Sequence, residues 1–308
     1  MLKNLILLFI ALLFNACFAV EEVSPPPKWF LSLPKDNVFL YGNGSGKTLE
    51  ESKKNAINDL ASSIKLKVNS STSILNIQNN QEQESKILQN IQVSIENIEL
   101  QNITFTHTEY KNKQYYSQIK ISKNLLLKTL EDKYQDLYTQ LGSLNSKNCK
   151  SISIKDKNTF EDLLNQAKSL VQSIQALDFS SKLPSLKAYE DIFNQNSPLV
   201  LARLVFSDTD DKEAIKILSS EYAKFIQNVD EKNIQTIYNK ITIEPQQNKI
   251  IASLQANIND CDNKVVFYIQ LHSTEINKQK ALERLKIQLY KKLKEYQGNN
   301  QGNIPKIF

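Results

Sequence analysis

The sequence predicts an α+β protein made of two two-layer units, each with helices packed on a mostly antiparallel sheet, joined by a helical hairpin. Short apolar runs with the spacing of strands occur in two groups, and each group is followed by a long apolar stripe at helical spacing. Two further helical patterns lie between the groups. The 308 residues are 41% hydrophobic and include only six Gly, which excludes disordered and collagen-like chains.

Residues 1–19 are predicted to be a secretory signal peptide, because Lys3 precedes an unbroken apolar run over residues 5–14 and small residues follow it. This run is too short for a permanent membrane span. Two processing routes stay open. The residues before Cys17 resemble a bacterial lipobox, which predicts a lipid on Cys17, whereas cleavage after Ala19 would remove that cysteine. Both routes predict an exported chain.

Residues 20–34 are predicted to form an extended, proline-rich spacer, because the three prolines at 25–27 block a helix and favour polyproline geometry. Trp29 and Phe30 follow these prolines, and we expect both to dock on the first domain. The spacer would then connect an N-terminal anchor to the fold.

The first α+β domain is predicted over residues 35–146. A strand at 37–41 runs into a glycine-rich turn at 42–46, and Thr48 with Glu51 forms a capping pair that starts a helix. The remaining predicted elements are a strand at 66–77, a segment at 81–95 that fits a helix or a strand and that we assign to a helix, hairpin strands at 98–110 and 114–121 across residues 111–113, and a helix from Ser122 to about Gly142.

A helical hairpin connector is predicted over residues 147–196, with helices at 160–177 and 186–193 separated near Pro184. The second α+β domain follows at residues 197–297, and residues 298–308 are predicted to be a disordered tail. Its predicted elements are a strand at 199–206, a helix capped by Asp210, strands at 234–243, 250–258 and 265–271, and a helix at 282–296. The two domains repeat a similar order of elements, which suggests a duplication as a hypothesis.

Cys149 and Cys261 are candidates for a disulfide, since both lie in polar segments and an exported protein meets an oxidising compartment. The alternative is that both are small buried hydrophobic residues, and spacing does not exclude it.

The motifs predict no enzyme, metal site or cofactor. The glycines at 42–46 precede Lys47, but Gly42 lies one residue too late for a phosphate-binding loop, so we expect no nucleotide. His107 and His272 lack a neighbouring nucleophile motif, and metal-ligand spacings of Cys or His do not occur. A net charge of +5 spread over the chain is too small to predict nucleic-acid binding.

Four aromatic residues are weak candidates for an interaction surface. Tyr110, Tyr115 and Tyr116 cluster in the predicted hairpin, and Trp29 lies at the end of the spacer. Packing within the core and across strands is the alternative for all four.

Residues 26–142 resemble a known family. The resemblance rests on Trp29 and Pro34, the strand at 38–41 with the Gly42-x-Gly44 turn, the helix that carries Ala56 and Ala61, and the Gln114-Tyr115-Tyr116-Ser117 hairpin. The family is the twenty-kilodalton lipoprotein family, related to the N-terminal domain of the flagellar protein FlgT. In size the chain is most similar to its FlgP-associated branch, typified by FlgQ.

The resemblance implies a non-enzymatic structural protein of the periplasm, associated with the outer membrane, that supports the flagellar basal disk and motility. The implied partners are a second copy of the chain or a disk-forming, FlgP-like lipoprotein, and the outer membrane itself through a lipid on Cys17. The second hypothesis is an outer-membrane lipoprotein that binds host or cell-wall components independently of flagella.

Overall fold

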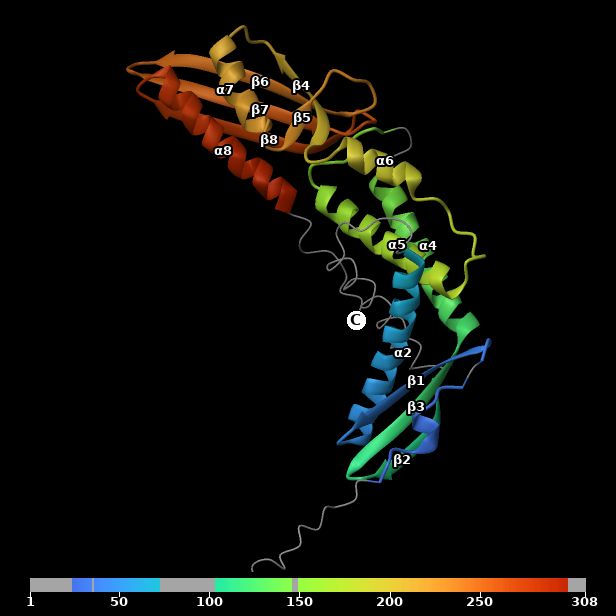
Figure 1. The fold of residues 1–308 in the computed structure, drawn as a ribbon. Coiled ribbons are helices and arrows are strands. Elements are labelled where there is room, and N and C mark those ends of the chain that lie inside the picture. The colour runs from blue at the N-terminus through green and yellow to red at the C-terminus, as the bar shows by residue number, and fades with distance from the viewer. Residues whose placement is uncertain (1–23, 35, 73–102, 146–148, 299–308) are drawn as a thin grey trace, which may run out of the picture. The chain divides into compact units, whose positions relative to one another are not determined.

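The computed structural model describes residues 24–34, 36–72, 103–145 and 149–298 (Figure 1). The fold is α+β, as predicted, with two sheets and helices that pack against them. The chain divides into two compact units. Of the described residues, the first unit takes those up to Ser63 and those from Ile103 to Lys123, and the second unit takes the remainder.

The first unit contains a three-stranded antiparallel sheet in the order β1-β3-β2. A short 3-10 helix, η1, precedes the sheet, and helix α2 connects its first strand to the other two. The bounds are η1 (Lys28–Phe30), β1 (Phe39–Gly46), α2 (Leu49–Thr72), β2 (Thr104–Lys111) and β3 (Gln114–Ser122).

The glycines at 42, 44 and 46 lie within β1, so the predicted glycine-rich turn is wrong. None of them has a positive φ, so the strand does not require their conformational freedom. They are needed for space. A Cβ atom on Gly42 would lie 2.2 Å from the carbonyl oxygen of Ala56, and one on Gly44 would lie 2.1 Å from the amide nitrogen of Ala56. Helix α2 therefore packs directly on the backbone of β1.

Helix α2 begins where the capping pair predicts. Thr48 Oγ1 accepts the backbone N–H of Glu51 at 3.1 Å, and Glu51 Oε2 accepts that of Lys47 at 2.7 Å. The helix continues to Thr72, so the predicted strand at 66–77 is wrong over residues 66–72. Extending a formed helix adds one hydrogen bond per residue, which outweighs the weak strand preference of Ser and Thr. Residues 73–77 and the predicted helix at 81–95 lie outside the described residues.

Strands β2 and β3 form the predicted hairpin with a tighter turn than expected. Asn112 and Lys113 alone connect them, with φ values of 53° and 60°, as in a type I′ turn. On β3, alternate residues are buried under α2, and Ser117 Oγ lies 2.7 Å from Ser52 Oγ in a buried hydrogen bond. The buried apolar residues on this face are Ile119 and Ile121.

The second unit includes the end of α2, from Ile64 to Thr72, and three further helices, α4 (Lys123–Leu144), α5 (Lys157–Leu177) and α6 (Lys187–Gln195). The sequence-based domain boundary at residue 146 placed α4 in the first domain, but from Asn124 onward the helix belongs to the second unit. Aromatic contacts explain this grouping. The ring of Tyr189 on α6 lies 5.2 Å from that of Tyr138 on α4 and 6.2 Å from that of Phe160 on α5.

The second unit ends in a five-stranded mixed sheet in the order β5-β4-β6-β7-β8. Strand β4 runs parallel to β5 and β6, whereas β6, β7 and β8 are antiparallel. The short strand β5 was not predicted. The strand bounds are β4 (Val200–Ser207), β5 (Ile226–Asn228), β6 (Gln235–Gln246), β7 (Lys249–Asn259) and β8 (Val265–Glu275).

The topologies of the two sheets do not support the duplication hypothesis. In the first sheet, β1 pairs antiparallel with its neighbour β3. In the second sheet, the corresponding first strand, β4, pairs parallel with β6. A shared order of elements along the chain therefore leads to two different sheets.

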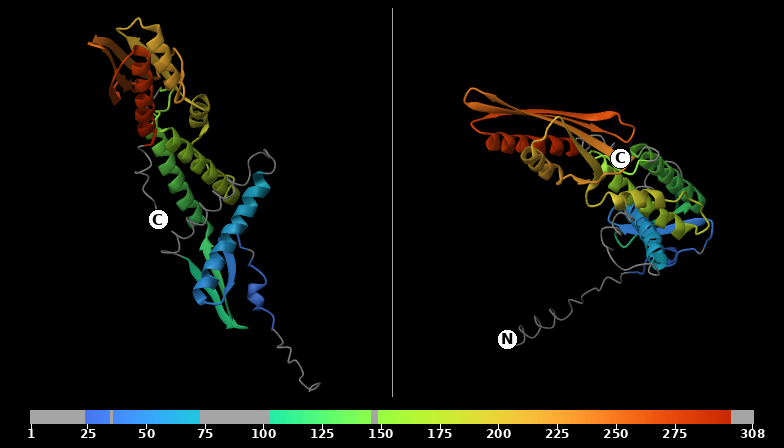
Figure 2. Two further views of the ribbon diagram at one scale, coloured as in Figure 1. Left: turned by 90° about the vertical axis from the view of Figure 1, so that its left-hand side faces the viewer. Right: turned by 90° about the horizontal axis from the view of Figure 1, so that it is seen from above.

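Helices α7 (Lys212–Tyr222) and α8 (Lys278–Gly298) lie on the same face of the five-stranded sheet (Figures 1 and 2). Every second residue of these strands points to the helices and is buried, and the residues between them point to the uncovered face. The buried residues include Ala252, Leu254, Ala256 and Ile258 on β7 and Ile269 and Leu271 on β8. None of the helices in the described part of the chain is long and apolar enough to cross a membrane.

The N-cap of α7 is Asp211, so the predicted cap at Asp210 is wrong. Asp211 Oδ1 accepts the backbone N–H of Ala214 at 3.1 Å, and Lys278 Nζ on α8 lies 2.7 Å from Asp211 Oδ2. The neighbouring aspartate lies one residue too early to reach that N–H. The hydrogen bond from Lys278, with the backbone N–H of Ala214, lowers the pKa of Asp211.

Replacing Gly44 by Ala is expected to destabilise the first unit by about 2 kcal/mol or more, because the added Cβ would overlap the backbone of α2 at Ser52 and Ala56. The control is Gly298→Ala, where an added Cβ meets no atom within 4 Å. Denaturant unfolding of the exported chain measures both changes. Equal stability of the two variants would contradict the close-packing role of Gly44.

Replacing Asp211 by Ala should cost about 1 kcal/mol of stability, the usual value of a lost N-cap, whereas Asp211→Asn keeps a capping side chain. The lowered pKa of Asp211 means that its charge stabilises the fold above the unfolded pKa of about 3.9 and that this contribution is lost as the pH falls through the lower folded value. The unfolding free energies of wild type and Asp211→Asn should therefore differ at neutral pH and converge at acidic pH. A constant difference would contradict the charge contribution.

Candidate functional site

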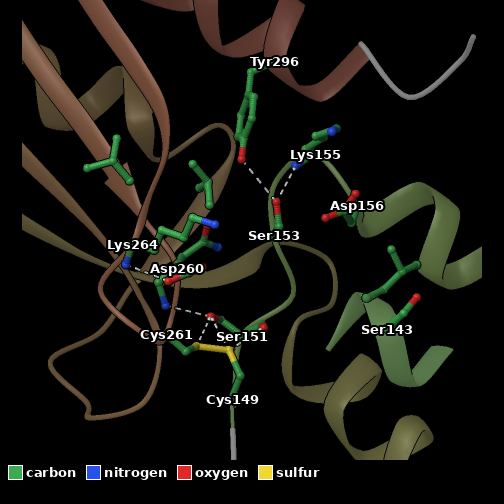
Figure 3. A pocket seen from close by; sticks show the side chains of 14 residues that line it. Ser143, Cys149, Ser151, Ser153, Lys155, Asp156, Asp260, Cys261, Lys264 and Tyr296 are labelled. Atoms are coloured by element: carbon green, nitrogen blue, oxygen red, sulfur yellow. Dashed lines mark hydrogen bonds between the residues drawn. A yellow bond between two sulfur atoms is a disulfide. The ribbon is translucent and has the colours of Figure 1, made fainter. Parts of the chain in front are cut away.

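A pocket of about 470 Å³ lies in the second unit, beside the segment that leads from α4 to α5. This volume is within the range of small-ligand sites. Its lining is rich in hydroxyl groups and carries charges of both signs (Figure 3). The polar lining residues are Ser143, Ser151, Ser153, Lys155, Asp156, Gln235, Asp260, Lys264 and Tyr296.

A disulfide between Cys149 and Cys261 forms part of the pocket wall, with a Cα–Cα distance of 5.6 Å (Figure 3). It joins the segment after α4 to the turn between β7 and β8. That turn is ordered by Asp260, whose Oδ1 accepts the backbone N–H groups of Asp262 at 3.0 Å and Lys264 at 2.8 Å. The disulfide therefore joins the segment that follows α4 to a turn of defined geometry.

Two buried amide side chains hold the segment that follows Cys149. Asn196 Oδ1 accepts the N–H of Ile152 at 3.1 Å, and its Nδ2 donates to the carbonyl of Lys150 at 2.8 Å. Gln235 Nε2 donates to the carbonyl of Ile152 at 3.0 Å, and the N–H of Gln235 donates to Ser151 Oγ at 2.7 Å. Buried polar groups of this kind are costly unless paired, so these bonds fix the path of the backbone.

Tyr296, near the end of α8, contributes a neutral hydroxyl to the pocket. Its hydroxyl lies 3.3 Å from Ser153 Oγ (Figure 3). Its ring stacks on Phe267 with centroids 4.2 Å apart. Burial raises the pKa of Tyr296, and the charges of Asp156 and Asp260 add to this effect. The hydroxyl therefore stays protonated and can donate a hydrogen bond, but it is unsuited to act as a base.

The pocket has the chemistry of a binding site. Neither His107 nor His272 lines it, and its two cysteines are joined in the disulfide. No cluster of His, Cys, Asp and Glu suited to a metal ion occurs within the described ranges. Serine hydroxyls without an adjacent imidazole are weak nucleophiles. Hydroxyl, amide, ammonium and carboxylate groups can instead hold a polar ligand by hydrogen bonds.

The structure separates the predicted tyrosine cluster. Tyr110 and Tyr115 are cross-strand partners with ring centroids 4.7 Å apart, and Tyr110 is 60% exposed. Tyr116 points to the other face of β3, is buried and contacts Phe30 at 4.9 Å. Adjacent residues of a strand point to opposite faces, so the three rings cannot form one surface.

Trp29 and Phe30 dock on the first unit. The indole of Trp29 stacks on His107 at 4.9 Å, and its Nε1 donates to Glu109 Oε2 at 3.3 Å. Trp29 therefore holds the spacer on β2, which is a packing role. His107 is engaged in this stack and in a 3.2 Å contact with Gln118 Oε1. Cys17 lies outside the described residues.

Sequence reasoning missed Asn196, Gln235 and Ser151. Each is a common polar residue in a segment that was predicted to be a connector or a strand end. No local pattern marks them, because their partners lie far away in sequence, as for Gln235 and Ile152.

Removing the disulfide by the double substitution Cys149→Ser and Cys261→Ser should cost about 2–5 kcal/mol, because the bridge closes a long loop, with a sequence separation of 112. Denaturant unfolding with and without a reductant measures this. The reductant should destabilise the wild-type chain by a similar amount and leave the double variant unchanged. A wild-type chain insensitive to complete reduction would contradict the bracing role.

Comparison with known families gives three consecutive matches along the chain. Residues 27–122 match the LPP20 lipoprotein model, residues 124–192 match the middle domain of an LPP20 lipofamily protein, and residues 199–291 match its C-terminal domain. A search of curated proteins gives no match.

Among solved structures, the chain is similar to the secreted protein HP1454 from the human pathogen Helicobacter pylori. The two share 25% identity with a TM-score of 0.48, over 84% of this chain and 97% of that chain. The three consecutive family matches support an LPP20-like lipoprotein family for this chain.

Proposed function

We propose that the chain is a non-enzymatic lipoprotein of the periplasm, held at the outer membrane by a lipid on Cys17, that supports assembly of the flagellar basal disk and motility. The observation that carries this proposal is the match of residues 27–122 to the LPP20 lipoprotein model, which begins shortly after Cys17. The flagellar part rests on the resemblance of the same region to the N-terminal domain of FlgT and to the FlgQ branch.

The geometry of the spacer supports an anchoring role for Cys17. Trp29 and Phe30 fasten the spacer to the first unit, and Ser24 Oγ donates to Asn112 Oδ1 at 2.8 Å. The stretch from Cys17 to Ser24 can span at most about 25 Å at full extension. A lipid on Cys17 would therefore hold the first unit close to the membrane surface.

The disulfide supports a location outside the cytosol. Structural disulfides persist in oxidising compartments such as the periplasm and are rare in the cytosol. The Cys149–Cys261 bridge braces the second unit, and an oxidising compartment would let this bridge form and persist. The assembly partners in this proposal are a second copy of the chain and a disk-forming, FlgP-like lipoprotein.

The pocket beside the disulfide favours a second candidate function. A site of about 470 Å³ with hydroxyl groups and both charges suits a small polar component of the cell wall or of a host surface. Under this alternative, the protein would act independently of flagella. Swimming in a deletion strain separates the two candidates, because the second predicts normal motility.

The motility test compares a deletion strain with strains that express the wild-type chain or a Cys17→Ser variant. We expect the deletion to impair swimming without slowing growth, and electron cryotomography to show loss of disk density around the motor. Cys17→Ser should release the protein from the outer membrane and restore swimming only in part. Normal swimming of the deletion strain would overturn the flagellar role.

The N-terminus of the mature protein tests the anchor separately. Mass spectrometry should find an acylated Cys17 as the first residue. A mature chain that starts at Val20 would overturn the lipid while leaving the motility result to decide the rest.

A further inference from the structure

Strand β8 forms one edge of the five-stranded sheet, and within the described part of the chain no strand pairs with its outer side. Residues 265–274 contain no charged residue, no Pro and no Gly. Three apolar side chains at its start are well exposed, Val265 at 51%, Val266 at 45% and Tyr268 at 51%. An exposed edge of this kind has unpaired backbone groups that can bind another strand.

Of the three other edge strands, β2 and β5 carry the usual protection against such pairing, whereas β1 also has no charged residue. Strand β2 of the first sheet bears Glu109 and Lys111, and its register shifts between Phe105 and His107. Strand β5, at the other edge of the five-stranded sheet, has only three residues. Charges, bulges and short length all discourage edge pairing. In β8 the register shift lies at its first residues, so the strand is regular from Phe267 to Glu275.

We propose that β8 pairs with β8 of a second copy of this chain, antiparallel, around a two-fold axis at Gln270. An antiparallel pair of this symmetry keeps both uncovered faces on the same side of one continuous sheet. Gln270 of one copy then lies opposite Gln270 of the other, and Tyr268 lies opposite the second copy's His272 on the uncovered side. Ile269 faces Leu271 on the side covered by the helices. Each of these opposite pairs is compatible in polarity.

The charges at the two ends of β8 favour this partner and this direction. Lys264 precedes the strand, and Glu275, which pairs with Arg284 on α8 at 2.5 Å, ends it. Antiparallel pairing brings Lys264 of one copy to the end of the strand where the other copy has Glu275. Parallel pairing would instead set Lys264 beside Lys264 and Glu275 beside Glu275, which is unfavourable.

One contact to the backbone of β8 must change for the strands to pair. Gln288 Nε2 on α8 donates to the carbonyl of His272 at 3.3 Å, and this contact is exposed. An exposed neutral hydrogen bond of this length is readily exchanged for a backbone hydrogen bond. The inference deepens the proposed assembly role and rests on it, since it names the surface through which two copies would associate.

A cysteine at the symmetry axis tests the pairing directly. In the mature full-length chain, Gln270→Cys should give a covalent dimer with a short bis-maleimide cross-linker, because directly opposite residues of antiparallel strands lie about 5 Å apart. The matched control is Gln255→Cys. Gln255 is the cross-strand partner of Gln270 on β7, and both are exposed glutamines on the same face. A dimer band of equal strength at both positions, or at neither, would overturn the proposal.

A charge at the same two positions tests the energetics. Gln270→Lys should weaken dimerisation about tenfold or more, because two like charges would meet at the axis, whereas Gln255→Lys should leave it unchanged. Sedimentation of the detergent-solubilised mature chain measures the mass, and circular dichroism verifies folding. A monomeric wild-type chain at all concentrations, or an undiminished dimer in Gln270→Lys, would overturn the inference.

The swimming test separates this inference from the proposed function. If the deletion strain swims normally while the cross-link forms at position 270, the dimer stands and the flagellar role fails. If the deletion abolishes swimming while no cross-link forms, the β8 edge is not the contact and the function stands.

Discussion

The second unit depends on the tertiary bonds that hold residues 149–154 in place. This short segment has no regular secondary structure to supply its own hydrogen bonds, yet Ile152 and Ile154 are buried. Its backbone is instead bonded by Asn196 and Gln235 and joined to the β7–β8 turn through Cys149. These tertiary bonds connect the α4–α6 helices to the sheet and form the wall of the pocket, so the pocket is a product of the same constraint.

The first unit depends on a different constraint, the absence of a side chain at three positions of β1. Glycine at positions 42, 44 and 46 lets the backbone of α2 approach that of β1. The opposite face of the small sheet is covered by Trp29 and Phe30 from the spacer. A three-stranded sheet alone has a small core, and these two layers add packing contacts on both of its faces. The segment next to the proposed anchor is thereby part of the fold.

Several elements could be predicted because their signals are local. The alternating apolar residues of β7 and β8, the Thr48–Glu51 capping pair and the long stripe of α8 depend on residues close in sequence. Other features could not, because they depend on distant partners. A Gly-rich run after a strand fits both a turn and a close-packed strand, and only the position of Ala56 on α2 distinguishes the two. The same holds for the tyrosines, which the pleat of β3 separates.

The sequence by itself determined the α+β class and most strands and helices; it also predicted export, and it contains no recognisable catalytic motif. It did so because hydrophobic period, leader composition and motif spacing are properties of neighbouring residues. Tertiary structure alone decided the parallel pairing of β4, the grouping of α4 with the later helices, the pocket and the uncharged edge at β8. These features arise where segments far apart in the chain meet, and no local pattern specifies which segments those are.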